Sequence, residues 1–244
     1  MFASSNPILN KKSFYTAPAD REKTFSLSGS LHLAMLLLSF IALVAASSWY
    51  VSINFQSIPN YFLSLSAMLA VITGYVIRFK RSLAFPLSYV YGLFKGVFIG
   101  LISAKYNQLY HGIVIQAVAL SFLVFMLMLF LYRFKLIVLT KRLRSIIISA
   151  TSAIVLVYLL SFLLYILDLP RIPYIHENGW IGILFSVFVS LTAAFHLLLN
   201  FDFIERAQKY KYPSYMEAYA AFGLIVSLVW QYLSILRLLK KTKN

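Results

Sequence analysis

Two of the seven acidic residues in this 244-residue chain flank one short polar hinge between apolar runs. Asp202 follows the run that begins at Trp180, and Glu217 opens the last run. A carboxylate beside an apolar span is costly in hydrocarbon and commonly faces a bundle interior, where it binds protons or cations. Asp202 is therefore a candidate proton sensor or calcium contact. The alternative is an interfacial acid paired with Arg206, four residues further along the same helix.

Glu217 and Lys95 carry the next two candidate charges. Glu217 stands where a helix would begin, so its alternative role is to complement the positive end of that helix. Lys95 lies about midway along an apolar run that starts at residue 84. A lysine at that depth cannot easily reach the interface, so we expect it to face a cavity or an acid partner. A shorter or tilted span is the alternative.

A polar stripe runs along the last two apolar runs. Thr192, His196 and Asn200 recur at four-residue spacing, and Ser227 and Gln231 form a similar pair near the middle of the final run. Residues at this spacing share one face of a helix. The stripe suits either a hydrated path with a histidine that titrates near neutrality, or hydrogen bonds between helices, which are the commoner arrangement.

Small residues mark a second helix face. Gly92, Gly96 and Gly100 also recur at four-residue spacing. This spacing lets the backbones of two membrane helices approach closely. It therefore predicts a tight helix–helix contact rather than a chemical site.

Composition and run length define the elements that position these residues. The chain is 61% hydrophobic and 12% charged, with a mean hydropathy of +0.82. A helix needs about 20 apolar residues to cross a bilayer. The sequence predicts an all-α membrane protein with one seven-helix transmembrane domain over residues 30–239, a flexible cytoplasmic arm over 1–29 and a basic tail over 240–244. The seven predicted spans are 30–47, 60–77, 84–104, 112–132, 145–167, 180–200 and 217–236.

Basic residues predict the orientation of these spans. Fifteen Lys and Arg residues fall in the N-terminal arm and in the loops after the second, fourth and sixth spans. Two fall in the loops after the first, third and fifth spans. The positive-inside rule then places the N-terminus in the cytoplasm, and Arg78 on the same membrane face as Asp202 and Glu217. The basic residues after Leu236 conflict with the rule if the last run crosses fully. Either that run stops short, or the rule is broken there.

The net charge of +15 is explained by basic loops against anionic headgroups, without nucleic acid. There is no cysteine, and no zinc-protease, phosphate-loop or serine-hydrolase motif is present. We therefore expect a protein that is not an enzyme and carries no cofactor.

Three segments give the chain a family resemblance. They are FDFIE at 201–205, YME at 215–217 and YGLFKGVFIGLIS at 91–103. With these, the chain resembles the Bax inhibitor-1 family, in particular its bacterial members, over nearly its whole length. The resemblance implies six helices around a central C-terminal helix, and a pH-sensitive calcium leak.

The resemblance also implies roles for individual residues. In the family an arginine at the end of the second helix latches an aspartate of the sixth helix, and these positions match Arg78 and Asp202. A second aspartate is expected where Ser227 stands, and an acid where Lys95 stands. We expect an Arg78–Asp202 ion pair that opens when Asp202 is protonated, with Glu217 or Lys95 modulating it.

Two functions remain open at this stage. The first is a pH-sensitive calcium or cation leak channel in the bacterial cytoplasmic membrane. The second is a non-conducting regulator that acts on a membrane protease or a stress or cell-death pathway through protein partners. The lipid bilayer is a partner in both.

Overall fold

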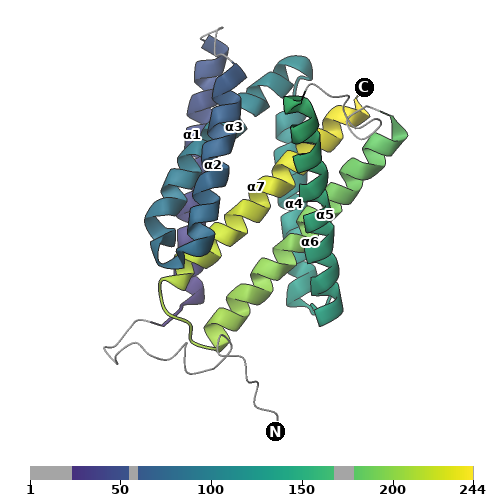
Figure 1. Ribbon diagram of the computed structural model, residues 1–244. Coiled ribbons are helices and arrows are strands. Elements are labelled where there is room, and N and C mark those ends of the chain that lie inside the picture. Colours follow the sequence, from purple (N-terminus) through teal and green to yellow (C-terminus); the bar gives the residue numbers. More distant parts are fainter. Residues whose placement is uncertain (1–23, 55–59, 168–178, 244) are drawn as a thin grey trace.

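The computed structural model describes residues 24–54, 60–167 and 179–243 and places seven long helices in them (Figure 1). The helices are α1 (Leu27–Asn54), α2 (Asn60–Phe79), α3 (Ala84–Leu109), α4 (Ile113–Arg133), α5 (Lys141–Ile166), α6 (Trp180–Lys209) and α7 (Met216–Thr242), with a 3-10 turn η2 (Arg81–Leu83) between α2 and α3. Each helix is long and apolar enough to cross a membrane. The predicted seven-span, all-α fold is confirmed.

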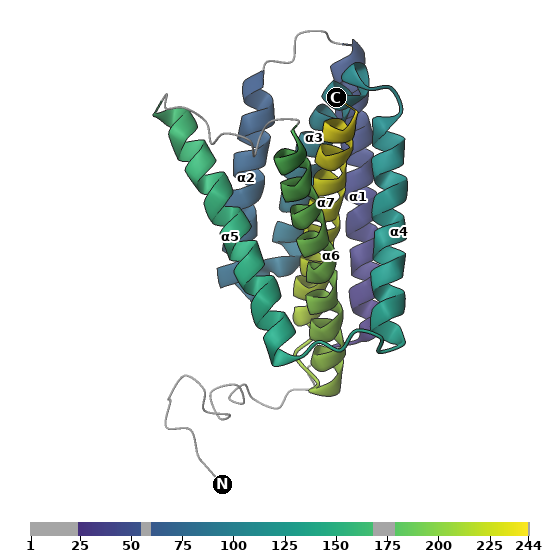
Figure 2. The same cartoon turned by 90° about the vertical axis from the view of Figure 1, so that its right-hand side faces the viewer.

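Helix α7 crosses the middle of the bundle, and α6 runs beside it (Figures 1 and 2). Over the most apolar stretch of each helix, 56% of α7 and 50% of α6 is buried, against at most 28% in the other five. The remaining helices leave most of their apolar side chains on the outside, as helices that face lipid do. The expected central C-terminal helix is therefore present.

Helices α1 and α3 form the tightest pair in the bundle, and the glycine stripe lies between them. A Cβ atom added at Gly96 would lie 2.8 Å from Val44, and one added at Gly92 would lie 3.1 Å from Phe40. At Gly100 the added atom would overlap the Ser48 hydroxyl. The glycines thus allow the two backbones to approach, as their spacing predicts.

Helix α5 is the most loosely attached element. It packs mainly on α6, and only 11% of its most apolar stretch is buried. Figure 2 shows α5 inclined away from α6 and α7, with its two ends at different distances from them. Contacts between α5 and α6 therefore decide where α5 sits.

Several helices continue beyond the predicted spans, as α1 does to Asn54 and α3 does to Leu109, and three further boundaries change the predicted domains or the hinge. Helix α1 begins at Leu27, so residues 27–29 belong to it rather than to the arm. Helix α6 continues to Lys209, nine residues past the predicted end. Residues 240–242 complete α7 rather than forming a tail. The rest of the predicted arm, residues 1–23, lies outside the described residues, as does the loop over 168–178.

The C-terminal cations lie at the end of the bundle opposite the start of α1 (Figure 1). Helix α7 has 27 residues, about 40 Å of helix, so it spans the full bundle. The Lys241 ammonium donates to the Gly182 carbonyl of α6 at 2.9 Å. The Arg237 guanidinium donates to the Tyr158 hydroxyl of α5 and lies 4.9 Å from the centre of that ring. These cations hold three helices together at one end.

Candidate functional site

The Asp202 carboxylate joins α5 to α6. Its Oδ2 atom accepts from Arg144, in the first turn of α5, and from Arg206 at 2.7 Å on its own helix. The Asp202 side chain is 19% exposed, while Arg144 and Arg206 are 35% and 40% exposed. One partly buried carboxylate therefore balances two arginines that reach toward solvent.

The predicted ion pair between Arg78 and Asp202 is not formed. Arg78 is exposed at the end of α2, and both ion pairs found in the described part of the chain involve Asp202 with other arginines. The positions of α5 and α6 explain why Asp202 pairs with other arginines. Because α6 continues past Asp202, Arg206 stays on the same face, and the start of α5 brings Arg144 to the carboxylate. Helix α2 instead packs mainly on α3, and the turn η2 that follows it contacts α7, where the Arg81 guanidinium lies 5.3 Å from the Tyr219 ring centre.

A second acid of α6 reaches a third helix. The exposed Glu205 carboxylate accepts from the Tyr132 hydroxyl of α4. Glu205 lies three residues after Asp202, so the two acids occupy neighbouring positions on the helix and contact different neighbours. Sequence reasoning did not single out this contact or Arg144. The signal for Arg144 was its place in the basic loop that the topology put on the same face as Asp202.

Glu217 acts at the start of two helices rather than beside Asp202. It lies in the first turn of α7, and its Oε1 accepts from the backbone N–H of Ser26 at 2.7 Å, immediately before α1. The preceding residue, Phe25, is buried between α6 and α7, and its N–H donates to the Tyr212 carbonyl at 2.7 Å. A negative charge stabilises the positive end of a helix. Glu217 thus fastens the segment before α1 to the α6–α7 hinge.

Replacing Glu217 with alanine should release this segment, whereas glutamine should largely retain it. Alanine removes the acceptor of the Ser26 N–H, while the glutamine carbonyl can still accept it; the loss is about 1 kcal/mol for such a bond. Limited proteolysis of the purified protein measures the difference as faster cleavage near residues 24–26 in the alanine variant. Equal cleavage in both variants and the wild type would show that Phe25 alone holds the segment.

The polar stripe forms hydrogen bonds between α6 and α7. The Asn200 amide donates to the Ser227 hydroxyl at 2.6 Å, and the His196 Nδ1 atom lies 3.3 Å from the same oxygen. The His196 ring meets Trp230 edge to face at 5.6 Å. Ser227 is 2% exposed. This arrangement favours helix pairing over an open path. Thr192 does not join, because its hydroxyl donates to the Phe188 carbonyl of its own helix.

Two buried polar atoms near the same helices have no partner in the described residues. They are the Gln231 Oε1 and the Ser190 hydroxyl, on residues that are 1% and 9% exposed. Leaving such a group without a hydrogen bond costs about 1–3 kcal/mol. The Gln231 oxygen, one turn beyond Ser227 on α7, is therefore an acceptor to which no described group donates.

Replacing Ser227 with alanine should lower the stability of the α6–α7 pair. The Asn200 amide and the His196 nitrogen lose their shared partner, which costs about 1–2 kcal/mol. Thermal unfolding in detergent measures the change. Ser152→Ala on α5 is the control, because that exposed hydroxyl bonds only the Ile148 carbonyl of its own helix. Equal melting temperatures for the two variants would contradict a role for Ser227 between helices.

Lys95 forms no ion pair within the described residues, so the acid partner that was one of its two expected environments is not found there. Its ammonium lies 5.1 Å from the centre of the Phe98 ring on the same helix. The sequence contains the reason: its seven acids lie in the N-terminal arm, in connecting segments or near span ends, and none lies midway along a predicted span. An aromatic face attracts a cation and is the partner available at that depth.

In its described residues the structure has seven helices that can span a membrane, and the last of them is enclosed by the others. The acid–arginine contacts lie at one end and tie helices together. These features define a polytopic membrane protein. The family described as Bax inhibitor 1 like matches residues 6–244, and the chain belongs to that family. No match was found among curated proteins. In the part of the chain that the structure describes, no group of three or more His, Asp or Glu residues is placed to hold a metal ion.

Proposed function

We propose that this protein is a pH-responsive cation leak pathway of the Bax inhibitor type, with calcium as the transported ion. The observation that carries the proposal is the single partly buried carboxylate, Asp202, that bonds Arg144 of α5 and Arg206 of α6. We place the protein in the bacterial cytoplasmic membrane with the N-terminus inside, as the distribution of basic residues predicts.

The proposed gate is the Asp202–Arg144 contact. The ionised carboxylate attracts both guanidinium groups and so holds the start of α5 against α6. Protonation removes the negative charge and leaves two cations beside each other, which repel. Because α5 has few other contacts, it is the helix that moves. The gate therefore opens as the pH falls. Arg144 takes the role that the family resemblance implied for Arg78.

Calcium flux into liposomes containing the purified protein tests this proposal. Wild-type flux should rise as the pH falls, and Asp202→Asn should give flux that is high and nearly independent of pH. Glu205→Gln is the matched control, since it changes a neighbouring acid that bonds Tyr132 of α4. Identical flux from wild type and Asp202→Asn at every pH would overturn the proposal.

The buried hydrogen bond between Ser227 of α7 and Asn200 of α6 favours a second function. Ser227 stands where the resemblance implies an acid, and it is buried in hydrogen bonds to Asn200 rather than lining an opening. Lys95 adds a midspan positive charge that would repel calcium. A non-conducting regulator of a membrane protease or stress pathway fits these features. Its test is co-purification of a stable membrane partner from native membranes, together with the absence of flux through the pure protein.

A further inference from the structure

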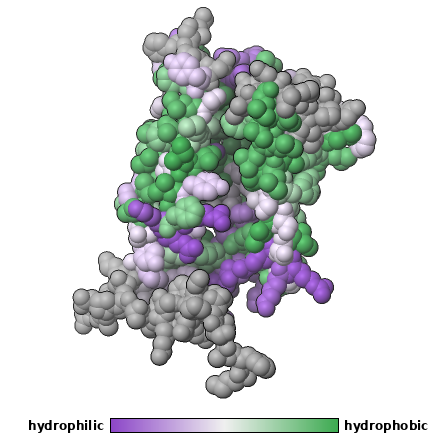
Figure 3. Space-filling model, in the orientation of Figure 1, coloured by the Kyte–Doolittle hydropathy of each residue, from purple (hydrophilic) through white to green (hydrophobic). Residues whose placement is uncertain are grey.

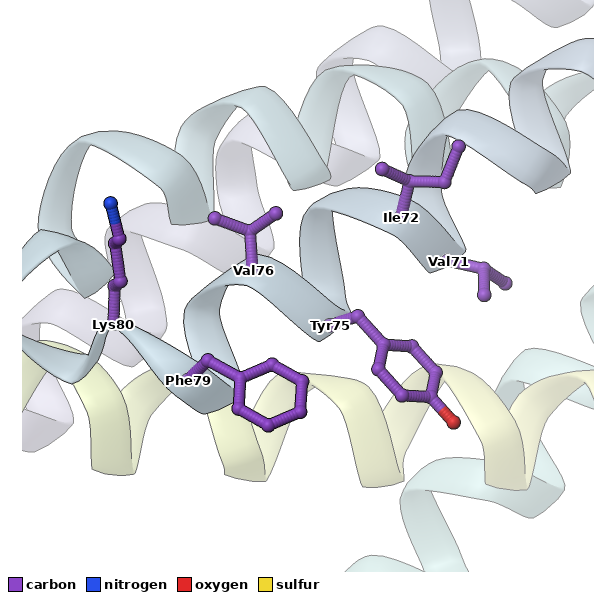
Figure 4. A pocket seen from close by; sticks show the side chains of 6 residues that line it. All are labelled: Val71, Ile72, Tyr75, Val76, Phe79 and Lys80. Carbon is purple, nitrogen blue, oxygen red and sulfur yellow. The ribbon is translucent and has the colours of Figure 1, made fainter.

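The outward face of α2 carries an open groove of about 360 Å³ (Figure 4). Five of its six lining residues are apolar or aromatic, and the sixth is a lysine at one end; they are Val71, Ile72, Tyr75, Val76, Phe79 and Lys80. In Figure 4, Ile72, Val76 and Lys80 lie in one row along the helix, and Tyr75 and Phe79 lie in a second row. The groove is therefore an open apolar surface along α2 that ends beside the Lys80 ammonium group.

No other described helix covers this face. Tyr75 is 61% exposed and Phe79 is 79% exposed, whereas Ile77, on the opposite side of α2, is fully buried. The groove lies within the part of α2 that is long and apolar enough to span a membrane. Figure 3 shows hydrophilic atoms gathered below the apolar surface of this side of the molecule. Whatever fills the groove therefore contacts hydrocarbon along most of its length and a charged zone at one end.

Two cations flank that end. Residues on a helix turn by about 100° each, so Arg78 falls within about 20° of Val71, at one edge of the groove, and Lys80 lines the other edge. Both side chains are exposed, and neither forms an ion pair in the described residues. The next cation, Arg81 of the turn η2, lies over the Tyr219 ring of α7 instead of beside the groove.

From this geometry we infer that the α2 groove is a binding site for an anionic phospholipid. One acyl chain lies along Val71, Tyr75 and Phe79, and the phosphate is held by Lys80, with Arg78 adding positive charge at the other edge of the groove. Lipid fits better than a soluble anion because the groove is apolar and opens to the bilayer along a spanning helix. Cations beside the membrane surface attract acidic lipids, and a lysine at the end of an apolar groove gives the phosphate a fixed position. This site goes beyond the proposed gate and shares no residue with it.

Native mass spectrometry of the full-length protein in detergent tests the inference. The probes are phosphatidylglycerol and phosphatidylcholine with identical acyl chains, and soluble glycerol phosphate. The wild type should bind the first phosphatidylglycerol more tightly than phosphatidylcholine and should not bind glycerol phosphate. The double variant Arg78→Gln/Lys80→Gln should bind phosphatidylglycerol about fivefold or more weakly, with little change for phosphatidylcholine.

The matched control is Lys141→Gln/Lys209→Gln, which removes two exposed cations from the same end of the bundle, away from the groove. It should keep the preference for phosphatidylglycerol, and Lys80→Arg should keep it as well. A third variant, Val76→Phe, narrows the groove and should weaken binding of both lipids. If both double variants lost phosphatidylglycerol binding equally, the lipid would be attracted by the positive charge of the whole surface, and the proposed site would be overturned. Binding of glycerol phosphate as tight as that of lipid, or unchanged binding in Arg78→Gln/Lys80→Gln, would also overturn it.

Discussion

Replacing Gly100 with alanine should destabilise the protein, although it adds only one methyl group. A Cβ atom at this position would overlap the Ser48 hydroxyl and the Ala45 carbonyl of α1. Backbone atoms cannot turn aside as a flexible side chain can, so the α1–α3 pair must separate. Overpacking of this kind costs about 1–3 kcal/mol. The melting temperature in detergent should fall by roughly 2–12 °C for a chain of this size.

Gly74→Ala on α2 is the matched control for this experiment. A Cβ atom there would lie 3.7 Å from Phe222 and 3.8 Å from Tyr91, which are ordinary contacts. Alanine also favours the helix over glycine by about 1 kcal/mol. Gly74→Ala should therefore leave the melting temperature unchanged or raise it. Similar losses in both variants would show that helix propensity or detergent sensitivity, rather than the α1–α3 approach, governs stability.

Asp202→Asn should give the largest change at the acid–arginine cluster. The carboxylate is the shared partner of Arg144 and Arg206, so asparagine removes the negative charge that attracts both guanidinium groups and leaves them one neutral carbonyl acceptor. The cost is about 1–2 kcal/mol, because both arginines are partly exposed and can recover water. Hydrogen exchange should then quicken at the start of α5 more than in α1 or α3, since α5 packs mainly on α6.

A double-mutant cycle separates the two ion pairs of Asp202. Asp202→Asn and Arg144→Gln should be strongly non-additive in unfolding experiments, because they break the same contact between helices. The cycle with Arg206→Gln should give a smaller coupling, as pairs at this spacing on one helix contribute about 0.3–0.5 kcal/mol. Additive effects of Asp202→Asn and Arg144→Gln would show that these two residues do not interact, and would contradict the proposed gate.

The helices were predictable from sequence because run length and hydropathy report directly on the bilayer. The glycine stripe on α3 also predicted a close contact, and the structure confirms it. The stripe did not identify α1 as the partner, since spacing describes one surface and not its neighbour. Helix ends were less well predicted: α6 runs on to Lys209 because the polar residues after Asn200 continue the helix beyond the apolar run.

The candidate site was predictable only in part. The local pairing of Asp202 with Arg206 follows from their spacing and is confirmed. The contact with Arg144 joins residues 58 positions apart, and only the arrangement of α5 against α6 creates it. Arg78 was a reasonable partner by topology and resemblance, but α2 packs mainly on α3, and the turn that follows it contacts α7 through Arg81. The hydrogen bonds of Ser227 depend on the register of α6 against α7, which side-chain spacing along one helix does not define.

The contacts at the end of α7 have a consequence for how the chain is assembled during synthesis. Under the proposed orientation, Arg237, Lys240 and Lys241 must cross the bilayer, and each such charge is costly at the centre of a helix. Arg237 and Lys241 donate to the Tyr158 hydroxyl of α5 and the Gly182 carbonyl of α6, and Lys240 lies 5.5 Å from the Tyr106 ring centre of α3. These three helices are synthesised before α7. We therefore expect the last helix to complete its insertion against an α5–α6 pair that is already formed, and we expect deletion of α5 to leave α7 incompletely inserted.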